Sequence, residues 1–387
     1  MARPAGLSFA GPMAEGATTS GLRLIVQNFR GVRRASWAPE GVCALVGPNA
    51  SGKSTLLEAF LFVHNAARRS LKDAILISGG MQGFISHEPV LDKPGDDPAL
   101  ALVRFTVETA EVSWMLAFSA TNDNVGSVYN ELLGEERSVD RAIDAPSIIA
   151  YPASRGRAEG VLFERVGDIL LYRPWELQPL RRQPFSDPAL DDVVLAPDGA
   201  NLFVVLQNWR DARADAWRFA WVTDWLRRIH PGSVTGLELK KGGGVLGAQF
   251  YAPGDETPLP IKHASHGILG TLLSLAAVAG GREGGIVLLD EPDNGLHPSA
   301  IRALVEAFRE LHDEHGVHVV LATHSPVILN AFSNAPEDVW VTEPKPGATF
   351  PVRLTDLCDP EWLANFRLGN LYGTGFGRQD PLSGSDG

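Results

Sequence analysis

Short, almost wholly apolar runs along this chain predict a sheet that is covered on both of its faces. Such runs occupy residues 42–46, 286–289 and 317–322, and a helical pattern covers residues 298–314 between the last two. Apolar strands separated by a helix are typical of parallel sheets, in which helices lie on both faces. The pattern therefore predicts an α/β fold around a parallel or mixed central sheet.

Other segments show the spacing of half-buried strands or of helices. Alternating strand patterns occupy residues 22–27, 103–107 and 113–120. Helical spacing occupies residues 54–65 and 267–279. Because alternating strands suit an antiparallel sheet, we expect an antiparallel β lobe beside the central sheet.

Changes of composition divide the chain into five segments. We expect a flexible tail, a first lobe with the antiparallel strands, a mostly helical insertion, a second lobe and a C-terminal extension. Their ranges are 1–20, 21–152, 153–235, 236–345 and 346–387. The insertion is rich in arginine, and its tryptophans at helical spacing are expected to be buried rather than to stack on bases. Those tryptophans are Trp209, Trp217, Trp221 and Trp225.

Composition narrows the class of protein and its compartment. The 387 residues include 34 Lys and Arg against 46 Asp and Glu, a formal net charge of −12, which disfavours a protein that coats DNA nonspecifically. Two cysteines are too few for a disulfide framework and predict a reducing compartment. No run approaches the roughly 18 apolar residues of a membrane span, and residues 1–20 lack the pattern of a secretion signal. We therefore expect a cytoplasmic protein without a membrane association.

The strongest local signal is GPNASGKS at residues 47–54, a phosphate-binding loop (P-loop) between an apolar strand and a helix. Gly47 and Gly52 allow the backbone to turn its amides inward around phosphates, and the helix directs its positive end there. Lys53 offers a charge to the β- and γ-phosphates, and Ser54 offers a hydroxyl to Mg²⁺. The predicted nucleotide-binding residues are Gly47, Pro48, Asn49, Ala50, Ser51, Gly52, Lys53, Ser54 and Thr55.

Two further strands end in side chains that suit nucleotide hydrolysis. Asp290 and Glu291 follow the run at 286–289, and His324 follows the run at 317–322. Since the carboxyl ends of parallel strands meet at one edge of a sheet, these residues are expected near the P-loop. Asp290 would hold Mg²⁺, and Glu291 would deprotonate the attacking water. His324 would either donate to the γ-phosphate or hold that water against Glu291.

Taken in order, these motifs resemble those of ABC-type ATPases of the SMC, RecF and OLD-like class. Residues 24–31 (LIVQNFRG) resemble the first strand of RecF-like and OLD-like ATPases, and residues 290–298 (DEPDNGLHP) resemble the segment around their second carboxylate. Residues 196–202 (APDGANL) resemble compact bacterial predicted ATPases of the AAA family. Since neither a nuclease domain nor a long coiled coil is recognised, the resemblance implies a stand-alone ABC-type P-loop ATPase head.

The resemblance also implies a homodimer that closes around two ATP molecules. In that class a Ser-Gly signature of one chain meets the γ-phosphate held by the other, and the matching residues are Ser265 and Gly267, with His266 where a small or acidic residue is usual. Gln82 falls where the class has a metal-contacting glutamine, with an ordinary polar loop residue as the open alternative. Arg30 is expected either at the nucleotide or in a surface ion pair.

The predicted reaction is the Mg²⁺-dependent conversion of ATP and water to ADP and phosphate. Two biological roles stay open. The first is a DNA-related or anti-phage defence process driven with a separately encoded, nuclease-like effector. The second is a regulatory ATP switch that binds no nucleic acid, which the net charge of −12 favours.

Overall fold

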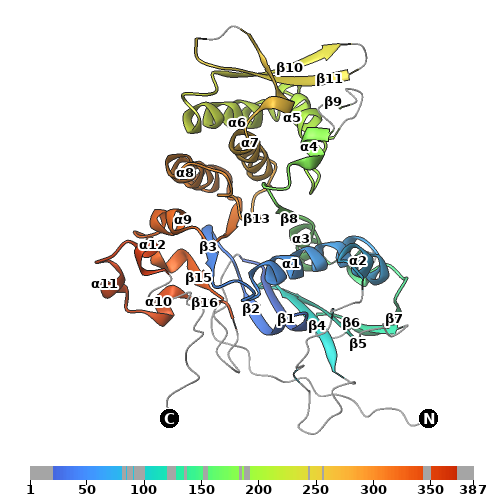
Figure 1. Ribbon diagram of the computed structural model, residues 1–387. Coiled ribbons are helices and arrows are strands. Elements are labelled where there is room, and N and C mark those ends of the chain that lie inside the picture. The colour runs from blue at the N-terminus through green and yellow to red at the C-terminus, as the bar shows by residue number, and fades with distance from the viewer. Residues whose placement is uncertain are drawn as a thin grey trace, which may run out of the picture.

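The computed structural model describes residues 21–80, 84, 90, 101–119, 128–134, 137–150, 156–182, 185–186, 192–242, 245–254, 257–342 and 350–372. The strands of this part of the chain form three sheets, with helices between and around them (Figure 1). Among these residues, every helix is too short or too polar to cross a bilayer.

The central sheet has six strands in the order β16–β15–β3–β14–β13–β8, which differs from their order along the chain. They are β3 (Val42–Val46), β8 (Ile169–Tyr172), β13 (Ile286–Asp290), β14 (His318–Ala322), β15 (Val339–Val341) and β16 (Val352–Arg353). Neighbouring strands are parallel throughout, except that β16 runs antiparallel to β15. The predicted α/β fold with a mixed central sheet is confirmed.

Alternate residues of the central strands pack on opposite faces of this sheet. In β3, Ala44 and Val46 join the hydrophobic cluster that includes α7 and α8, while Cys43 and Leu45 join the cluster that includes α1 and α3. These helices are α1 (Lys53–Arg68), α3 (Arg157–Gly167), α7 (His266–Ala279) and α8 (Pro298–His315). Because both faces are covered, every residue of β3 is buried, which explains its continuous apolar run.

One strand of the central sheet lies where the sequence suggested a helical insertion. β8 falls within residues 153–235, yet it pairs with β13, with Tyr172 opposite Leu289. Its four residues are ILLY, and so short an apolar run cannot be distinguished from a helical segment by periodicity. The pairing brings Arg173, the residue after β8, to the same edge of the sheet as Asp290.

The antiparallel lobe holds α1 against the central sheet. Its strand order is β2–β1–β4–β5–β6–β7. The strands are β1 (Arg23–Phe29), β2 (Val32–Trp37), β4 (Leu102–Glu108), β5 (Ser113–Ser119), β6 (Val128–Leu133) and β7 (Arg137–Ala142). Phe62 of α1 stacks on Phe105 of β4 with ring centroids 4.5 Å apart, and Phe29, Phe84 and Phe118 surround the pair. This aromatic core fixes the helix that follows the P-loop.

A helical layer with a small sheet lies beyond α7, at the top of Figure 1. It contains α5 (Leu202–Asp211), α6 (Ala216–Ile229), β9 (Phe185–Ser186), β10 (Gly236–Gly242), β11 (Val245–Tyr251) and β12 (Leu259–Pro260). Of the four tryptophans expected to be buried, Trp209 and Trp225 are buried, whereas Trp217 and Trp221 are only partly buried against the same core. The indoles of Trp221 and Trp225 both donate to Glu310 Oε1 of α8, at 3.0 and 2.8 Å, and thereby join this layer to the core.

Short helices after β14 form a C-terminal cluster. They are α9 (Pro326–Ala331), α10 (Leu354–Leu357), α11 (Pro360–Leu363) and α12 (Leu368–Leu371). The other helices of the described chain are α2 (Leu71–Ile77), α4 (Gln178–Arg182), η2 (Ile148–Ala150), η4 (Ile261–His263) and η5 (Pro336–Asp338). α12 packs on α9, where a Cβ on Gly369 would lie 2.1 Å from the Pro326 carbonyl oxygen. Only glycine allows this close approach.

We predict that the fold loses stability below about pH 6.5 because His318 is held neutral. Burial, with His312 and Arg165 nearby, lowers the pKa of His318 to about 4, and its Nδ1 accepts from the Gly41 amide at 2.9 Å. Since the unfolded chain binds the proton more tightly, this contribution is complete above the unfolded pKa and is lost as the pH falls towards 4. Urea unfolding of His318→Asn should show a smaller loss between pH 7 and pH 5 than the wild type. The same change at the exposed His263 is the control, and equal losses in all three proteins would contradict the prediction.

Candidate functional site

The P-loop joins β3 to α1 at the carboxyl edge of the central sheet (Figure 1). Lys53 folds back into it, because its Nζ donates to the carbonyl oxygens of Gly47 and Pro48 at 2.8 and 3.0 Å. Burial lowers the pKa of Lys53 to about 8, while Glu291 and Asp290 oppose that shift. The loop thus places a cation beside the N-terminal amides of a 16-residue helix, an arrangement that suits a polyphosphate.

The backbone of the P-loop is held by a residue that sequence reasoning missed. Thr342, just after β15, contacts Ser51 Oγ through its own hydroxyl at 2.6 Å and donates from its amide to the Val46 carbonyl at 2.8 Å. A Cβ on Gly47 would lie 2.3 Å from the Thr342 hydroxyl, so glycine is required there. No motif marks Thr342, because its role depends on β15 pairing with β3.

Asp290 and Glu291 lie where β13 ends. Asp290 is 6% exposed, and the turn after it gives Glu291 a φ of 52°, a left-handed conformation that is unusual for a side chain with a Cβ. The Glu291 amide donates to the Ala322 carbonyl at 2.8 Å, which holds that turn against β14. Burial, with Asp293 and Asp290 close by, raises the pKa of Glu291 to about 7.

His324 follows β14 and reaches the same place. Its Nε2 lies 3.5 Å from Glu291 Oε1, and its Nδ1 lies 3.3 Å from the Tyr372 hydroxyl. Burial and the charge of Lys53 lower the pKa of His324. The structure therefore brings Lys53, Glu291 and His324 together from the ends of neighbouring strands, as the sequence predicted they would lie.

A chain of ion pairs links this edge to the antiparallel lobe. Arg173, which follows β8, lies 3.5 Å from Asp290 Oδ2 through its Nε and 3.0 Å from Glu58 Oε1 through its Nη2. Glu58 also pairs with Arg30, whose guanidinium donates to the Ser78 carbonyl. Sequence reasoning noted Arg173 only as one of many arginines, and the signal that would have found it is its place after a short apolar run.

The other predicted residues have different surroundings. Arg30 makes the ion pair that was one of its two expected roles. Gln82 lies outside the described residues. Ser265 is exposed and accepts from the Ile268 amide at 3.2 Å, so it caps α7. A Cβ on Gly267 would lie 3.0 Å from the Gly295 carbonyl, so Gly267 packs against the loop that follows Glu291.

The donor set at this edge fits a nucleotide with Mg²⁺. Mg²⁺ prefers hard oxygen ligands, and the carboxylate of Asp290 and the exposed hydroxyl of Ser54 are of that kind. Lys53 and the α1 amides supply the positive groups that phosphate oxygens need. The predicted ligand classes are thus chemically consistent with the site.

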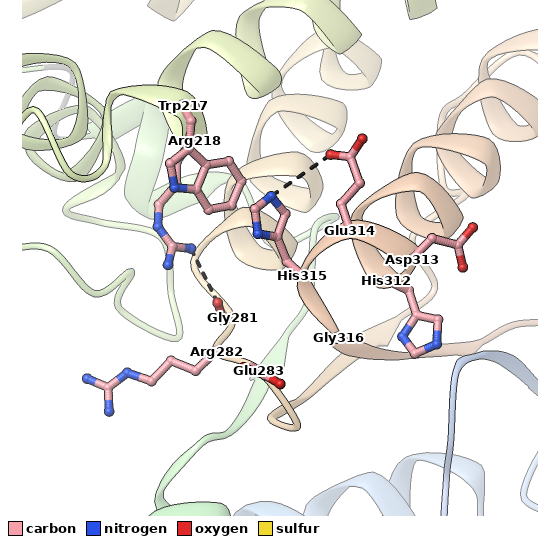
Figure 2. A pocket seen from close by; sticks show the side chains of 10 residues that line it. All are labelled: Trp217, Arg218, Gly281, Arg282, Glu283, His312, Asp313, Glu314, His315 and Gly316. Atoms are coloured by element: carbon pink, nitrogen blue, oxygen red, sulfur yellow. Dashed lines mark hydrogen bonds and ion pairs between the residues drawn. The ribbon is translucent and has the colours of Figure 1, made fainter.

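A separate polar hollow of about 760 Å³ lies at the opposite edge of the sheet, among the loops that precede β13 and β14 (Figure 2). Its aromatic and cationic side chains already contact one another or the chain. Trp217 stacks on His315 with ring centroids 3.8 Å apart. Arg218 donates to the Gly281 carbonyl oxygen and forms an ion pair with Asp215. The hollow and the P-loop therefore lie at opposite ends of the parallel strands.

The fold is that of the ABC-type P-loop ATPases. A sequence profile described as "AAA domain, putative AbiEii toxin, Type IV TA system" matches residues 42–144 and 118–330. The chain belongs to this family of AAA domains. The structure is also similar to the crystal structure of an Smc head bound to the C-winged helix domain of ScpA. The TM-score is 0.56 at 15% identity, over 88% of this chain and 99% of that one, a likeness of fold alone.

Curated relatives match over a shorter stretch. The energy-coupling factor transporter ATP-binding protein EcfA2 of Latilactobacillus sakei is 33% identical over 84 residues, which cover 22% of this chain and 28% of that protein. EcfA2 of Enterococcus faecalis is 30% identical over 115 residues, 28% of this chain and 37% of that protein. The chain therefore spans between 28% and 37% of the length of these two curated relatives.

We predict that Arg173→Ala destabilises the nucleotide-free protein by roughly 1–3 kcal/mol, because the nearly buried Asp290 loses the guanidinium that lies 3.5 Å from it. Added Mg²⁺ should stabilise this variant more than the wild type, since the ion neutralises the same carboxylates. Urea unfolding with and without Mg²⁺ measures both effects.

The matched control is Arg227→Ala, which removes an arginine from an exposed pair with Asp224. Arg173→Lys keeps the charge and should lie between the wild type and Arg173→Ala. An Arg173→Ala protein as stable as the Arg227→Ala protein would contradict the assignment.

Proposed function

We propose that this chain binds ATP and Mg²⁺ at the carboxyl edge of its central sheet and hydrolyses ATP to ADP and phosphate. The observation that carries the proposal is the convergence of Lys53, Glu291 and His324 from the ends of three neighbouring parallel strands. Hydrolysis of this kind needs few covalent steps from the protein and depends on positioning and charge neutralisation. These are the properties that the site supplies.

Each residue has a role in the proposed reaction. Lys53 and the α1 amides bind the β- and γ-phosphates, and Asp290 and Ser54 hold Mg²⁺. When bound, Mg²⁺ would neutralise charge that develops on the transferred phosphoryl group. Glu291 accepts a proton from the attacking water, and a pKa near 7 suits a general base that works at neutral pH.

We predict that Glu291→Gln retains ATP binding but loses turnover by at least about 100-fold, because the amide cannot accept the proton of the water. Lys53→Ala should weaken ATP binding by about 10- to 100-fold, because the phosphates lose a charged donor. Phosphate release measures turnover, and a fluorescent ATP analogue measures affinity.

The control is Glu283→Gln, which neutralises an exposed carboxylate in the loop at the other end of β13. It should behave as the wild type. Unchanged turnover in Glu291→Gln would contradict the assignment of Glu291 as the general base. Unchanged ATP affinity in Lys53→Ala would contradict the assignment of residues 47–54 as the phosphate-binding loop.

A homodimer with two ATP molecules between its chains is part of the proposal. Ser265 is exposed at the N-terminus of the 14-residue α7, where a hydroxyl and free amides suit the γ-phosphate held by a second chain. Gly267 is buried against the Gly295 carbonyl oxygen, so its part in the signature would come from its backbone amide. These features support Ser265 and Gly267 as the parts that act in trans.

For the biological role, we propose an ATP-driven component of a DNA-related or defence process that works with a separately encoded effector, such as a nuclease. The family description names a putative toxin of a toxin–antitoxin system, which supports a role in defence. The second candidate is a regulatory ATP switch that binds no nucleic acid. The net charge of −12 favours it, because a negative surface repels the phosphate backbone.

We predict that Glu291→Gln with ATP and Mg²⁺ forms a dimer that retains an effector. Light scattering after size exclusion measures the dimer, and mass spectrometry of a native pull-down, with and without nuclease treatment, identifies what it holds. Adding Ser265→Ala should abolish the dimer, because the trans contact to the γ-phosphate is lost.

Ser299→Ala, at the exposed start of α8, is the matched control and should leave the dimer intact. A protein or nucleic acid held by Glu291→Gln but not by Lys53→Ala would support the effector role. A dimer that holds nothing else would support the regulatory switch instead, and a monomer under all conditions would refute the proposed homodimer.

A further inference from the structure

One side chain outside the predicted site joins the P-loop to His324. Tyr372, the residue after α12, donates from its hydroxyl to the Gly47 carbonyl oxygen at 3.0 Å. The same hydroxyl lies 3.3 Å from His324 Nδ1. These contacts connect residues that are 325 and 48 positions apart in the chain. The phenol thus lies between the loop that surrounds the phosphates and the histidine that faces Glu291.

The position of Tyr372 is fixed by the helix that follows His324. The Gly369 amide donates to Asn330 Oδ1 at 2.9 Å, and the Leu368 amide donates to Ser333 Oγ at 3.1 Å. Leu368 is fully buried in the core cluster. Since α9 begins two residues after His324, α12 holds the phenol in a constant place relative to the imidazole.

The protons of these groups can be assigned from their chemistry. A phenol has one proton, and the Tyr372 hydroxyl lies closer to the Gly47 carbonyl oxygen, at 3.0 Å, than to His324 Nδ1, at 3.3 Å. Because the carbonyl can only accept, even though Lys53 also donates to it, we assign the Tyr372 proton to this shorter contact. The phenol oxygen can then only accept from His324, which requires a proton on Nδ1. A neutral imidazole has one proton, so Nε2, which lies 3.5 Å from Glu291 Oε1, presents a lone pair.

We infer that Tyr372 is a positioning residue that holds His324 as the Nδ1–H tautomer, so that Nε2 accepts a hydrogen bond from the attacking water. This inference rests on the proposed ATPase function. It decides between the two roles expected of His324, because an Nε2 without a proton cannot donate to the γ-phosphate. The water is then held by two acceptors, Nε2 and the Glu291 carboxylate, and Glu291 takes its proton.

The first test needs no nucleotide. In full-length protein labelled with ¹⁵N-histidine, the nitrogen shifts of His324 report which nitrogen has the proton, and His324→Gln assigns the signals. The wild type should show a protonated Nδ1 and an unprotonated Nε2. Tyr372→Phe keeps the ring but removes the acceptor, so His324 should change to the Nε2–H tautomer that free histidine prefers.

Tyr251→Phe is the matched control, because it removes a phenol hydroxyl from β11, which hydrogen-bonds Glu238 in another sheet. It should leave the His324 signals unchanged. A wild-type His324 with its proton on Nε2 would overturn the inference without any variant. A Tyr372→Phe protein that keeps the Nδ1–H tautomer would overturn it as well.

The second test separates positioning from simple support of the fold. Tyr372→Phe should lower kcat by about 10- to 100-fold with little change in ATP affinity, because the phosphate contacts of Lys53 stay in place. Equal kcat values for Tyr372→Phe and the wild type would overturn the positioning role. A wild type that binds ATP but releases no phosphate would refute the proposed function. The tautomer of His324 is measured without nucleotide, so that measurement would still test the hydrogen bond between Tyr372 and His324 independently.

Discussion

The parallel register of the central strands is the constraint on which the rest of this structure depends. Leu289 pairs with Tyr172 on one side and with Leu321 on the other, and Leu321 pairs with Ala44. The strands β8, β13, β14 and β3 therefore end on one line, and the residues that follow them share one edge. A shift of one residue in any pair would turn a buried side chain to the opposite face, so the two hydrophobic clusters hold this register.

Charge is concentrated at that edge and is balanced there. Asp290, Glu291 and Asp293 would repel one another in the absence of cations, and Lys53 and Arg173 are the cations that approach them. The balance is incomplete, because burial still raises the pKa of Glu291 to about 7. A divalent cation at this edge would reduce the residual electrostatic cost.

Conformational strain accompanies the electrostatic cost. Glu291 has a φ of 52° and Ala50 a φ of 61°, and each lies at a sharp turn of the site. Left-handed residues with a Cβ persist only where the surroundings hold them. The Glu291 turn is held by the hydrogen bond from its amide to the Ala322 carbonyl oxygen, so the proposed general base depends for its position on the strand that carries His324.

The sequence by itself determined the α/β class, the P-loop, the paired carboxylates at 290 and 291 and the histidine at 324, since each motif is contiguous and follows an apolar run. Only the tertiary structure decided the places of β8, Arg173, Thr342 and Tyr372. These depend on a strand order that does not follow the chain and on contacts such as that of Tyr372 with Gly47, 325 residues away. Local pattern reports which faces of an element are buried, whereas pairing between distant strands and helices decides which side chains meet.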